Sequence, residues 1–242
     1  MNQSSRRILT IETSGRAGSV VLGAGIGYAD AQIVESSTLP GTMRHASELM
    51  PTIDRLVKQQ NWPADSITDV FVSIGPGSFT GLRIGVSVAR ALAWSIGAEI
   101  IAVPTVDALA RNALEADPIP GHLAVVLDAK RKQIYTAAFD IANNRVTKTI
   151  DACLADPADF FARCPKPLAV LGEGVAYHRE AIDAAGVLVL DEILWPARAQ
   201  NIFYVGLELA ADGKYTSGPD LMPLYIRRPE AEEKWEKLHG KK

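Results

Sequence analysis

The chain has 242 residues, 48% of them hydrophobic, so it is long enough to bury two small cores or one large one. Its formal net charge of -3 excludes a general basic surface of the kind that holds nucleic acid by counterion release. Two cysteines without CxxC or Cys/His spacing exclude a disulfide framework, and no apolar run is long enough to span a membrane, so we expect a cytoplasmic protein.

The first segment predicts a strand, a turn and a return strand. Residues 7–12 (RILTIE) are apolar and β-branched, the polar cluster TSGRAG follows, and SVVLG resumes the apolar pattern. QIVESS predicts a third strand. From Ser47 onward apolar residues recur at helical spacing, which predicts an amphipathic helix with Pro51 in its first turns.

The next segment alternates between strands and helices. DVFVSI (69–74) predicts a strand, and a Gly/Pro-rich loop leads into a helix over 81–96 that stops at Gly97. EIIAV then predicts a strand and TVDALARNALEA a helix. This order favours parallel strands joined by crossovers, and the DPIPG cluster at 117–121 marks a domain boundary.

The second half opens as the first half does. LAVVLD, the charged turn AKRKQ and IYTAAFD again predict strand, turn and strand, and each opening strand ends in an acid, Glu12 or Asp128. Helices and strands then alternate up to RAQNIFYVGLELAADG. We therefore predict a duplicated α/β protein with lobes at 1–117 and 118–212 and a partly disordered tail at 213–242.

The glycine-rich segment SIGPGSFTGLRIG matches neither common nucleotide-binding motif. It lacks the lysine and the spacing of a Walker loop, and its third glycine falls one position late for a Rossmann fingerprint. A phosphate at the helix N-terminus remains an alternative. The favoured interpretation is a tight strand-to-helix turn, rigidified by its hydroxyl groups. The turn residues are Gly75, Gly77, Ser78, Thr80 and Gly81.

The helix after this turn carries only two charged residues, Arg83 and Arg90, and is apolar around most of its circumference. Glycine or alanine also recurs at every fourth position from Gly81 to Gly97, which lets another backbone approach closely. The pattern leaves two interpretations open. The helix is buried within its own domain, or it completes its burial against another subunit.

Other polar groups support two interpretations each. Glu12 and Asp128 would hold a magnesium-bound phosphate in a two-lobed ATPase cleft or, as we favour, make ordinary turn hydrogen bonds. The four histidines lack ligand spacing, so no metal site is expected. The basic run at 130–132 is a solvated hairpin tip or a contact for RNA phosphate.

Several segments together resemble the TsaB family, whose older name is YeaZ. They are ILTIETSGRAGSVVL, HASELMPTIDRL, GPGSFTGLRIGVSVARALA, LDAKRKQIYTAAFD and PLYIRR, in the family's order from residue 8 to about 228. The resemblance implies a duplicated two-lobe fold of the actin, sugar-kinase and Hsp70 ATPase type (the ASKHA fold), with mixed sheets flanked by helices. It also implies tRNA modification as the function.

The resemblance implies a non-catalytic scaffold that binds and activates a TsaD-type transferase. That partner threonylcarbamoylates adenosine 37 of tRNAs reading ANN codons, and it carries an H-x-x-x-H metal pair at positions that correspond to Thr105 and Leu109 here. Neither residue replaces a metal-ligating histidine, and GEGVAYHRE (172–180) lacks the glycine pair expected of an adenosine loop. We therefore expect no catalytic site, no metal and no cofactor of the chain's own.

In the family the first two helices form the subunit interface. Carried over, the interface residues are Leu49, Ile53, Leu56, Leu82, Arg83, Val86, Ala89 and Arg90.

The expected partners are the transferase in a heterodimer, a TsaE-type small ATPase, and a second copy of this chain as an alternative. We expect the chain to contact tRNA only as part of this complex. ATP or ADP with Mg²⁺ would bind at the interface between the subunits. The competing hypothesis is a free-standing ASKHA-type kinase or ATPase built on Glu12 and Asp128. A peptidase is a third hypothesis, and no catalytic dyad in the sequence supports it.

Overall fold

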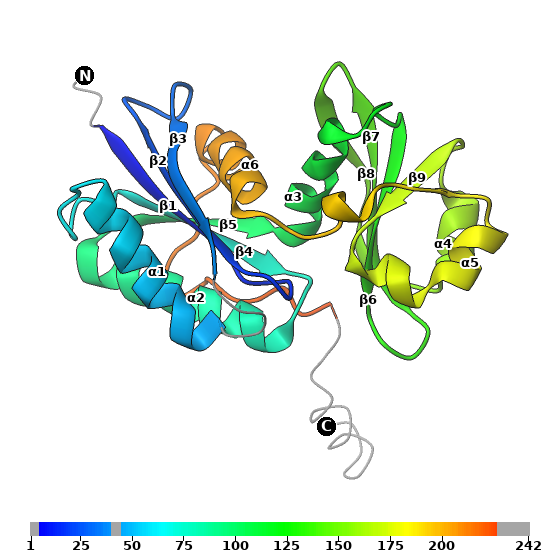
Figure 1. The fold of residues 1–242 in the computed structure, drawn as a ribbon, viewed down its shortest axis with the longest axis horizontal. Helices are drawn as coiled ribbons and strands as arrows, with labels where there is room; N and C mark the ends of the chain where they lie inside the picture. The colour runs from blue at the N-terminus through cyan, green and yellow to red at the C-terminus, as the bar shows by residue number, and fades with distance from the viewer. Residues whose placement is uncertain (1–4, 40–44, 227–242) are drawn as a thin grey trace, which may run out of the picture.

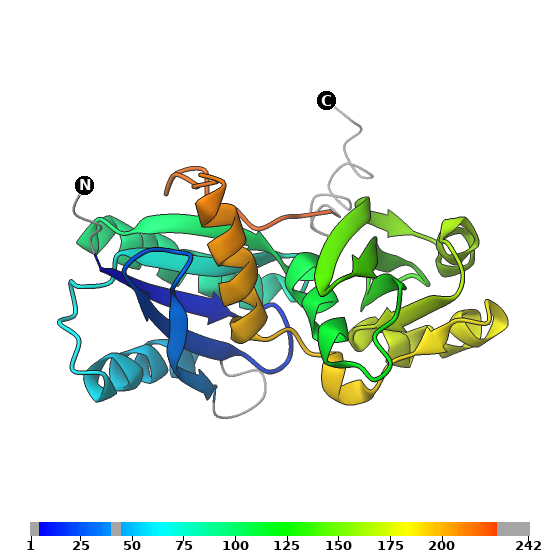
Figure 2. The same cartoon turned by 90° about the horizontal axis from the view of Figure 1, so that it is seen from above.

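The computed structural model describes residues 5–39 and 45–226, and these ranges form two lobes, each built on a five-stranded sheet (Figures 1 and 2). The first sheet has the strand order β3-β2-β1-β4-β5. Its strands are β1 (Arg6–Glu12), β2 (Ser19–Gly25), β3 (Gln32–Thr38), β4 (Asp69–Gly75) and β5 (Glu99–Pro104).

The second sheet has the order β10-β9-β6-β7-β8. Its strands are β6 (His122–Asp128), β7 (Ile134–Ala142), β8 (Arg145–Ala155), β9 (Leu168–Leu171) and β10 (Leu188–Val189).

The strand orders confirm the internal duplication that the two similar openings predict. Read from the opposite edge, the second sheet is β8-β7-β6-β9-β10, which repeats the first with each strand replaced by its counterpart. In both lobes the opening strand pairs antiparallel with the next one and parallel with the fourth. A repeated apolar strand, polar turn and return strand therefore encodes the same sheet twice.

Helices cover both faces of each sheet (Figure 1). On the first sheet α1 and α2 pack against Leu9 and Ile11, while α6 packs on the other face against Ile8 and Phe71, as the alternation of side chains along a strand requires. The α-helices are α1 (His45–Gln59), α2 (Phe79–Ile96), α3 (Thr105–Arg111), α4 (Pro157–Arg163), α5 (Arg179–Ala184) and α6 (Ala199–Ala211). The 3₁₀ turns are η1 (Asn112–Glu115), η2 (Glu173–Tyr177) and η3 (Glu192–Leu194).

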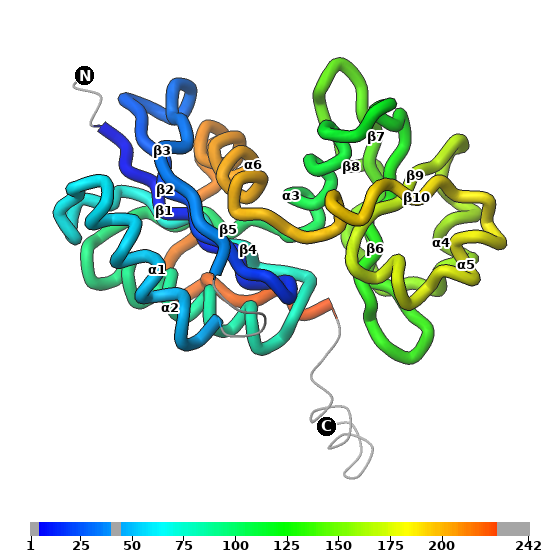
Figure 3. Tube along the Cα trace, in the orientation of Figure 1, coloured from blue at the N-terminus to red at the C-terminus, as the bar shows by residue number. Residues whose placement is uncertain are grey.

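The last helix of each predicted lobe packs in the core of the other lobe. The two cores therefore do not follow the division predicted at residues 117 and 212. Val106 and Leu109 of α3 pack in the core of the second lobe, whereas Ile202 and Phe203 of α6 pack in the core of the first. Figure 3 traces these two crossings of the chain between the lobes. The DPIPG cluster does separate α3 from β6, but it does not separate the two cores, because α3 contributes Val106 and Leu109 to the core of the second lobe and Ala108 to that of the first.

The segment after α6 returns along the first lobe. Thr216 donates its backbone N–H to Ile100 at 2.9 Å, Leu224 donates to Ile74 at 2.7 Å, and Leu221 is fully buried in the core beneath α1 and α2. Residues 213–226 are thus an ordered strap on the first sheet. The remainder of the predicted tail, 227–242, lies outside the described residues. Within the described ranges, none of the helices has both the length and the apolar character that a membrane span requires.

Candidate functional site

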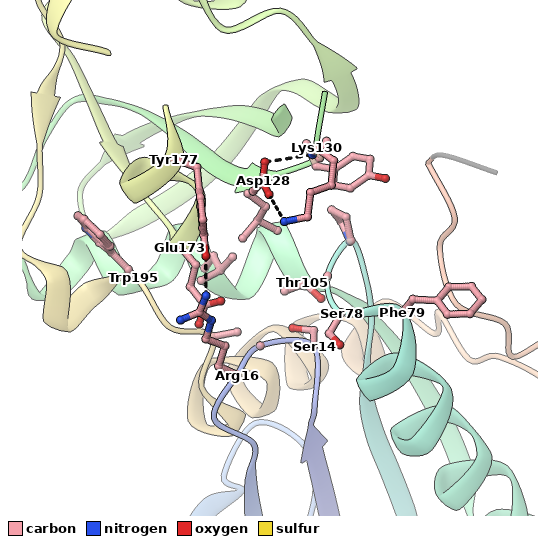
Figure 4. Close-up of a pocket in the computed structure, with 18 of the residues that line it drawn as sticks. Ser14, Arg16, Ser78, Phe79, Thr105, Asp128, Lys130, Glu173, Tyr177 and Trp195 are labelled. Carbon is pink, nitrogen blue, oxygen red and sulfur yellow. Dashed lines mark hydrogen bonds and ion pairs between the residues drawn. The ribbon is translucent and has the colours of Figure 1, made fainter. Parts of the chain in front are cut away.

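A cleft of about 610 Å³ lies between the lobes (Figure 4). The first lobe contributes the turn between β1 and β2 and the glycine turn before α2, and the second contributes the β6–β7 turn and η2. Arg16 and Ser78 thus face Asp128, Lys130 and Tyr177 across the cleft.

The glycine turn connects β4 to α2, as the sequence predicts. Ser78 is the N-cap of α2, and its Oγ accepts the N–H of Gly81 at 3.3 Å. Its own N–H is donated to the carbonyl of Ser14 at 2.7 Å. A Cβ on Gly77 would lie 2.6 Å from the Ser14 oxygen, and one on Gly81 would lie 2.0 Å from the Thr13 oxygen.

These contacts explain why the turn needs glycines. The β1–β2 turn lies directly against it, so a side chain at Gly77 or Gly81 would collide with the backbone of Ser14 or Thr13. Gly75, at the end of β4, has a positive φ of 114°. Thr80 is exposed in the first turn of α2.

The two acids that would form the alternative magnesium site are not brought together. Glu12 is fully buried and does not line the cleft; its Oε1 accepts the N–H of Ser14, and its Oε2 has no partner among the described residues. Asp128 does line the cleft, where its carboxylate contacts the Lys130 Nζ at 2.7 Å and the His178 Nε2 at 3.2 Å. Burial raises the pKa of Asp128, but the hydrogen bonds from Lys130 and His178 outweigh it and hold that pKa below its ordinary value.

These acids do not fit a magnesium nucleotide, because one is enclosed in the core and the other is already paired. The loop 172–180 does not fit a nucleotide either. A Cβ on Gly172 would lie 2.3 Å from the Val126 oxygen, and one on Gly174 would lie 2.6 Å from the backbone of Leu127. The two glycines therefore allow η2 to pack against β6.

Glu12 makes the stability of the fold depend on pH. Burial raises its pKa above the ordinary value of 4.5, and the hydrogen bonds from Ser14 oppose the rise only in part. The unfolded chain releases this proton at lower pH than the folded chain does, so the free energy of unfolding should fall as the pH rises from about 4.5 towards the raised pKa.

Glu12→Gln keeps the acceptor for Ser14 and removes this titration. In urea unfolding across pH 4 to 8, we expect the stability of the native chain relative to the variant to decrease with rising pH. A constant difference over that range would show that folding does not raise the pKa of Glu12.

The structure corrects six of the eight predicted interface residues. Their side chains are at most 4% exposed, and all but that of Leu82 lie in the core between α1, α2 and the sheet, so they do not form an outward surface of this chain. The six are Leu49, Ile53, Leu56, Leu82, Val86 and Ala89.

The ridge of small residues on α2 likewise faces the chain's own sheet. A Cβ on Gly85 would lie 2.4 Å from the Thr13 Oγ1. The ridge therefore brings α2 close to β1 rather than to another subunit. Arg83 and Arg90 are exposed. The Arg83 guanidinium lies 3.8 Å from the centroid of the Phe79 ring, and its Nε donates to the Tyr225 hydroxyl at 3.1 Å.

The outward face of α2 carries a residue that the sequence analysis missed. Trp94 is 90% exposed, although burying a tryptophan is strongly favourable. It follows Ser87 and Ala91 at helical spacing, and both of these are exposed as well. The helical wheel could have revealed it, because Trp94 lies on the same stripe as Ser87 and Arg90.

The positions aligned with the metal pair of the transferase both line the cleft. Thr105 accepts the backbone N–H of Gly75 with its Oγ1 at 3.1 Å, and Leu109 is 1% exposed. Neither offers a ligand that a transition metal prefers. Across the described residues, three or more His, Cys, Asp or Glu side chains do not gather in a metal-binding arrangement.

Comparison with known proteins identifies the family. A family model described as "TsaD: tRNA N6-adenosine threonylcarbamoyltransferase" matches residues 41–235. The tRNA threonylcarbamoyladenosine biosynthesis protein TsaB of Bacillus subtilis is 31% identical, over 94% of this chain and 97% of that protein. The chain belongs to the TsaB family. The TsaB protein of Escherichia coli is 26% identical, over 97% of this chain and 99% of its own length.

A solved structure, YeaZ from Pseudomonas aeruginosa, confirms the fold. It superposes with a TM-score of 0.73 at 21% sequence identity and covers 91% of this chain and 99% of its own. The duplicated two-lobe ASKHA architecture is therefore that of the TsaB family, whose members take part in the biosynthesis of threonylcarbamoyladenosine in tRNA.

Proposed function

We propose that this chain is a non-catalytic subunit that binds and activates a TsaD-type transferase, which threonylcarbamoylates adenosine 37 of tRNAs reading ANN codons. One observation carries the non-catalytic role. Thr105 and Leu109 line the cleft at the positions where the transferase has its metal-binding histidines. A hydroxyl already used by Gly75 and an enclosed leucine do not replace two imidazoles.

The outward face of α1 and α2 is the proposed docking surface. It is defined by Met50 and Pro51 on α1 and by Ser87, Ala91 and Trp94 on α2, all of them exposed. The two helices pack side by side on the same face of the first sheet (Figure 1). A lone exposed tryptophan amid small residues suits insertion into a pocket of a partner, and tryptophan is enriched among residues that dominate binding energy.

Membership of the TsaB family supports a proposal for the wider assembly. The partner is the transferase in a heterodimer, with a TsaE-type small ATPase as a further component and a homodimer through the same surface when the transferase is absent. ATP or ADP with Mg²⁺ would bind at the interface between subunits, since Glu12 and Asp128 of this chain do not form a magnesium site.

Reconstituted tRNA modification tests the proposal. Reactions would contain the transferase, the small ATPase, the threonylcarbamoyl donor and tRNA, with or without this chain. We expect modification to require the chain, and the chain alone to modify nothing and to hydrolyse no ATP. Equal modification without it would overturn the activating role. ATP hydrolysis by the purified chain would favour the free-standing ATPase instead.

A further inference from the structure

The turn between β6 and β7 holds three consecutive basic residues in left-handed backbone. Lys130, Arg131 and Lys132 have φ values of 62°, 53° and 62°. Residues other than glycine and asparagine rarely adopt this conformation, which costs on the order of 1 kcal/mol or more for each. Gln133 closes the turn by donating to Lys130 at 3.0 Å, and Asp128 accepts the Lys130 N–H at 3.0 Å.

This strained turn lies at the edge of the cleft. Lys130 and Arg131 both line the cleft, and the paired strands on either side hold the turn in place. Asparagine or glycine would form the same turn with less strain. The three cations are thus not the residues that turn formation alone favours, although Lys130 also pairs with Asp128 at 2.7 Å.

An aromatic ring lies between cations from the two lobes. Tyr177, on η2, is 54% exposed and its hydroxyl accepts a hydrogen bond from Arg16 of the first lobe. The Lys130 Nζ lies 5.3 Å from the centroid of the same ring. Figure 4 shows the tyrosine and the arginine meeting across the cleft.

The local charge contrasts with that of the whole chain. The cleft is lined by the cations Arg16, Lys130 and Arg131 and by the acids Asp128 and Glu173. Lys132 adds a further positive charge on the adjoining turn, although the chain carries a net charge of -3. The edge of the cleft is thus a positive patch with a partly exposed aromatic ring.

We propose that the β6–β7 turn, Arg16 and Tyr177 form a contact for single-stranded RNA, with a phosphodiester held by the cations and an unstacked base on the tyrosine ring. Proteins bind single strands by this combination of cations and aromatic platforms. The proposal rests on the proposed function, in which the complex acts on a tRNA, and it gives this chain a direct contact within that complex.

A single phosphodiester fits the patch better than a free nucleoside triphosphate does. The N-cap residue Ser78 donates its backbone N–H to Ser14, Gly81 donates its own to the Ser78 hydroxyl, and Glu12 is enclosed in the core. The cleft therefore lacks the open pair of acids that would hold the Mg²⁺ of a nucleoside triphosphate.

The test uses the full chain assembled with its transferase and a fluorescent anticodon stem-loop of a tRNA reading ANN codons. The triple variant Lys130→Asn, Arg131→Asn, Lys132→Gly removes the charges with residues that suit left-handed backbone, so the turn is preserved. We expect its RNA affinity, from anisotropy, to fall about tenfold and the slope of log affinity against log salt to decrease by about one. Tyr177→Leu should weaken binding about fivefold or more without changing that slope.

A matched triple, Arg163→Ser, Lys166→Ser, Arg179→Ser, removes the same charge from exposed positions around α4 and α5. We expect it to bind RNA as the unmodified complex does. An equal loss in both triples, or no loss in the turn variant, would overturn the contact. Loss of ATP binding with unchanged RNA binding would assign the patch to a mononucleotide instead. Size-exclusion chromatography of the unmodified proteins tests assembly separately, so failure of the proposed function is distinguished from failure of this inference.

Discussion

Trp94→Ala is expected to weaken association with the transferase by about 30-fold or more, which corresponds to about 2 kcal/mol. The side chain is 90% exposed in this chain, so its truncation removes few internal contacts. A buried tryptophan anchor in a complex, by contrast, contributes a large apolar area at the centre of the interface. Isothermal titration calorimetry with the purified transferase measures the change directly.

Ala91→Arg tests the same surface by adding bulk one helical turn before Trp94, and we expect a comparable loss. Ile26→Ala is the matched control, because Ile26 is a large apolar side chain, 61% exposed, outside α1 and α2. The Ile26→Ala variant should bind the transferase with the affinity of the unmodified chain. Unchanged affinity in the Trp94 and Ala91 variants would place the docking surface elsewhere. Ala89→Arg is an unsuitable test, although Ala89 is among the predicted interface residues, because Ala89 is fully buried and an arginine there would disrupt the core.

Gly81→Ala is expected to destabilise the chain by about 3 kcal/mol or more. The new Cβ would lie 2.0 Å from the Thr13 carbonyl oxygen, and both groups belong to backbone that the sheet and the helix hold in place. Relief would require α2 to move away from β1, which would expose Val86 and its neighbours in the core. Urea unfolding followed by tryptophan fluorescence measures the free energy of unfolding.

Gly121→Ala is the control for this effect, because a Cβ there meets no atom within 4 Å. We expect its stability to lie within about 0.5 kcal/mol of the unmodified chain. A loss below about 1 kcal/mol in Gly81→Ala would mean that the β1–β2 turn yields easily.

Local patterns in the sequence determined most of the secondary structure and the duplication. The apolar run of β1 and its counterpart β6, each followed by a polar turn, recur because both encode the same hairpin. Ser78 and Gly97 mark the ends of α2 as a capping hydroxyl and a left-handed C-cap, roles that depend only on neighbouring backbone. The motifs that resemble the TsaB family also lie within such short segments.

The tertiary structure alone decided which surface each apolar face covers. The small ridge of α2 is compatible with a neighbouring subunit or with its own sheet, and only the approach of Gly81 and Gly85 to Thr13 selects the sheet. The exchange of α3 and α6 between lobes is equally invisible in sequence, since an apolar stripe specifies burial but not the partner that provides it. In the candidate site, too, only the tertiary structure decided which side chains are exposed. Glu12 and Asp128 end equivalent strands, yet one is enclosed in the core and the other faces the cleft, because side-chain direction and the packing of distant segments set their exposure.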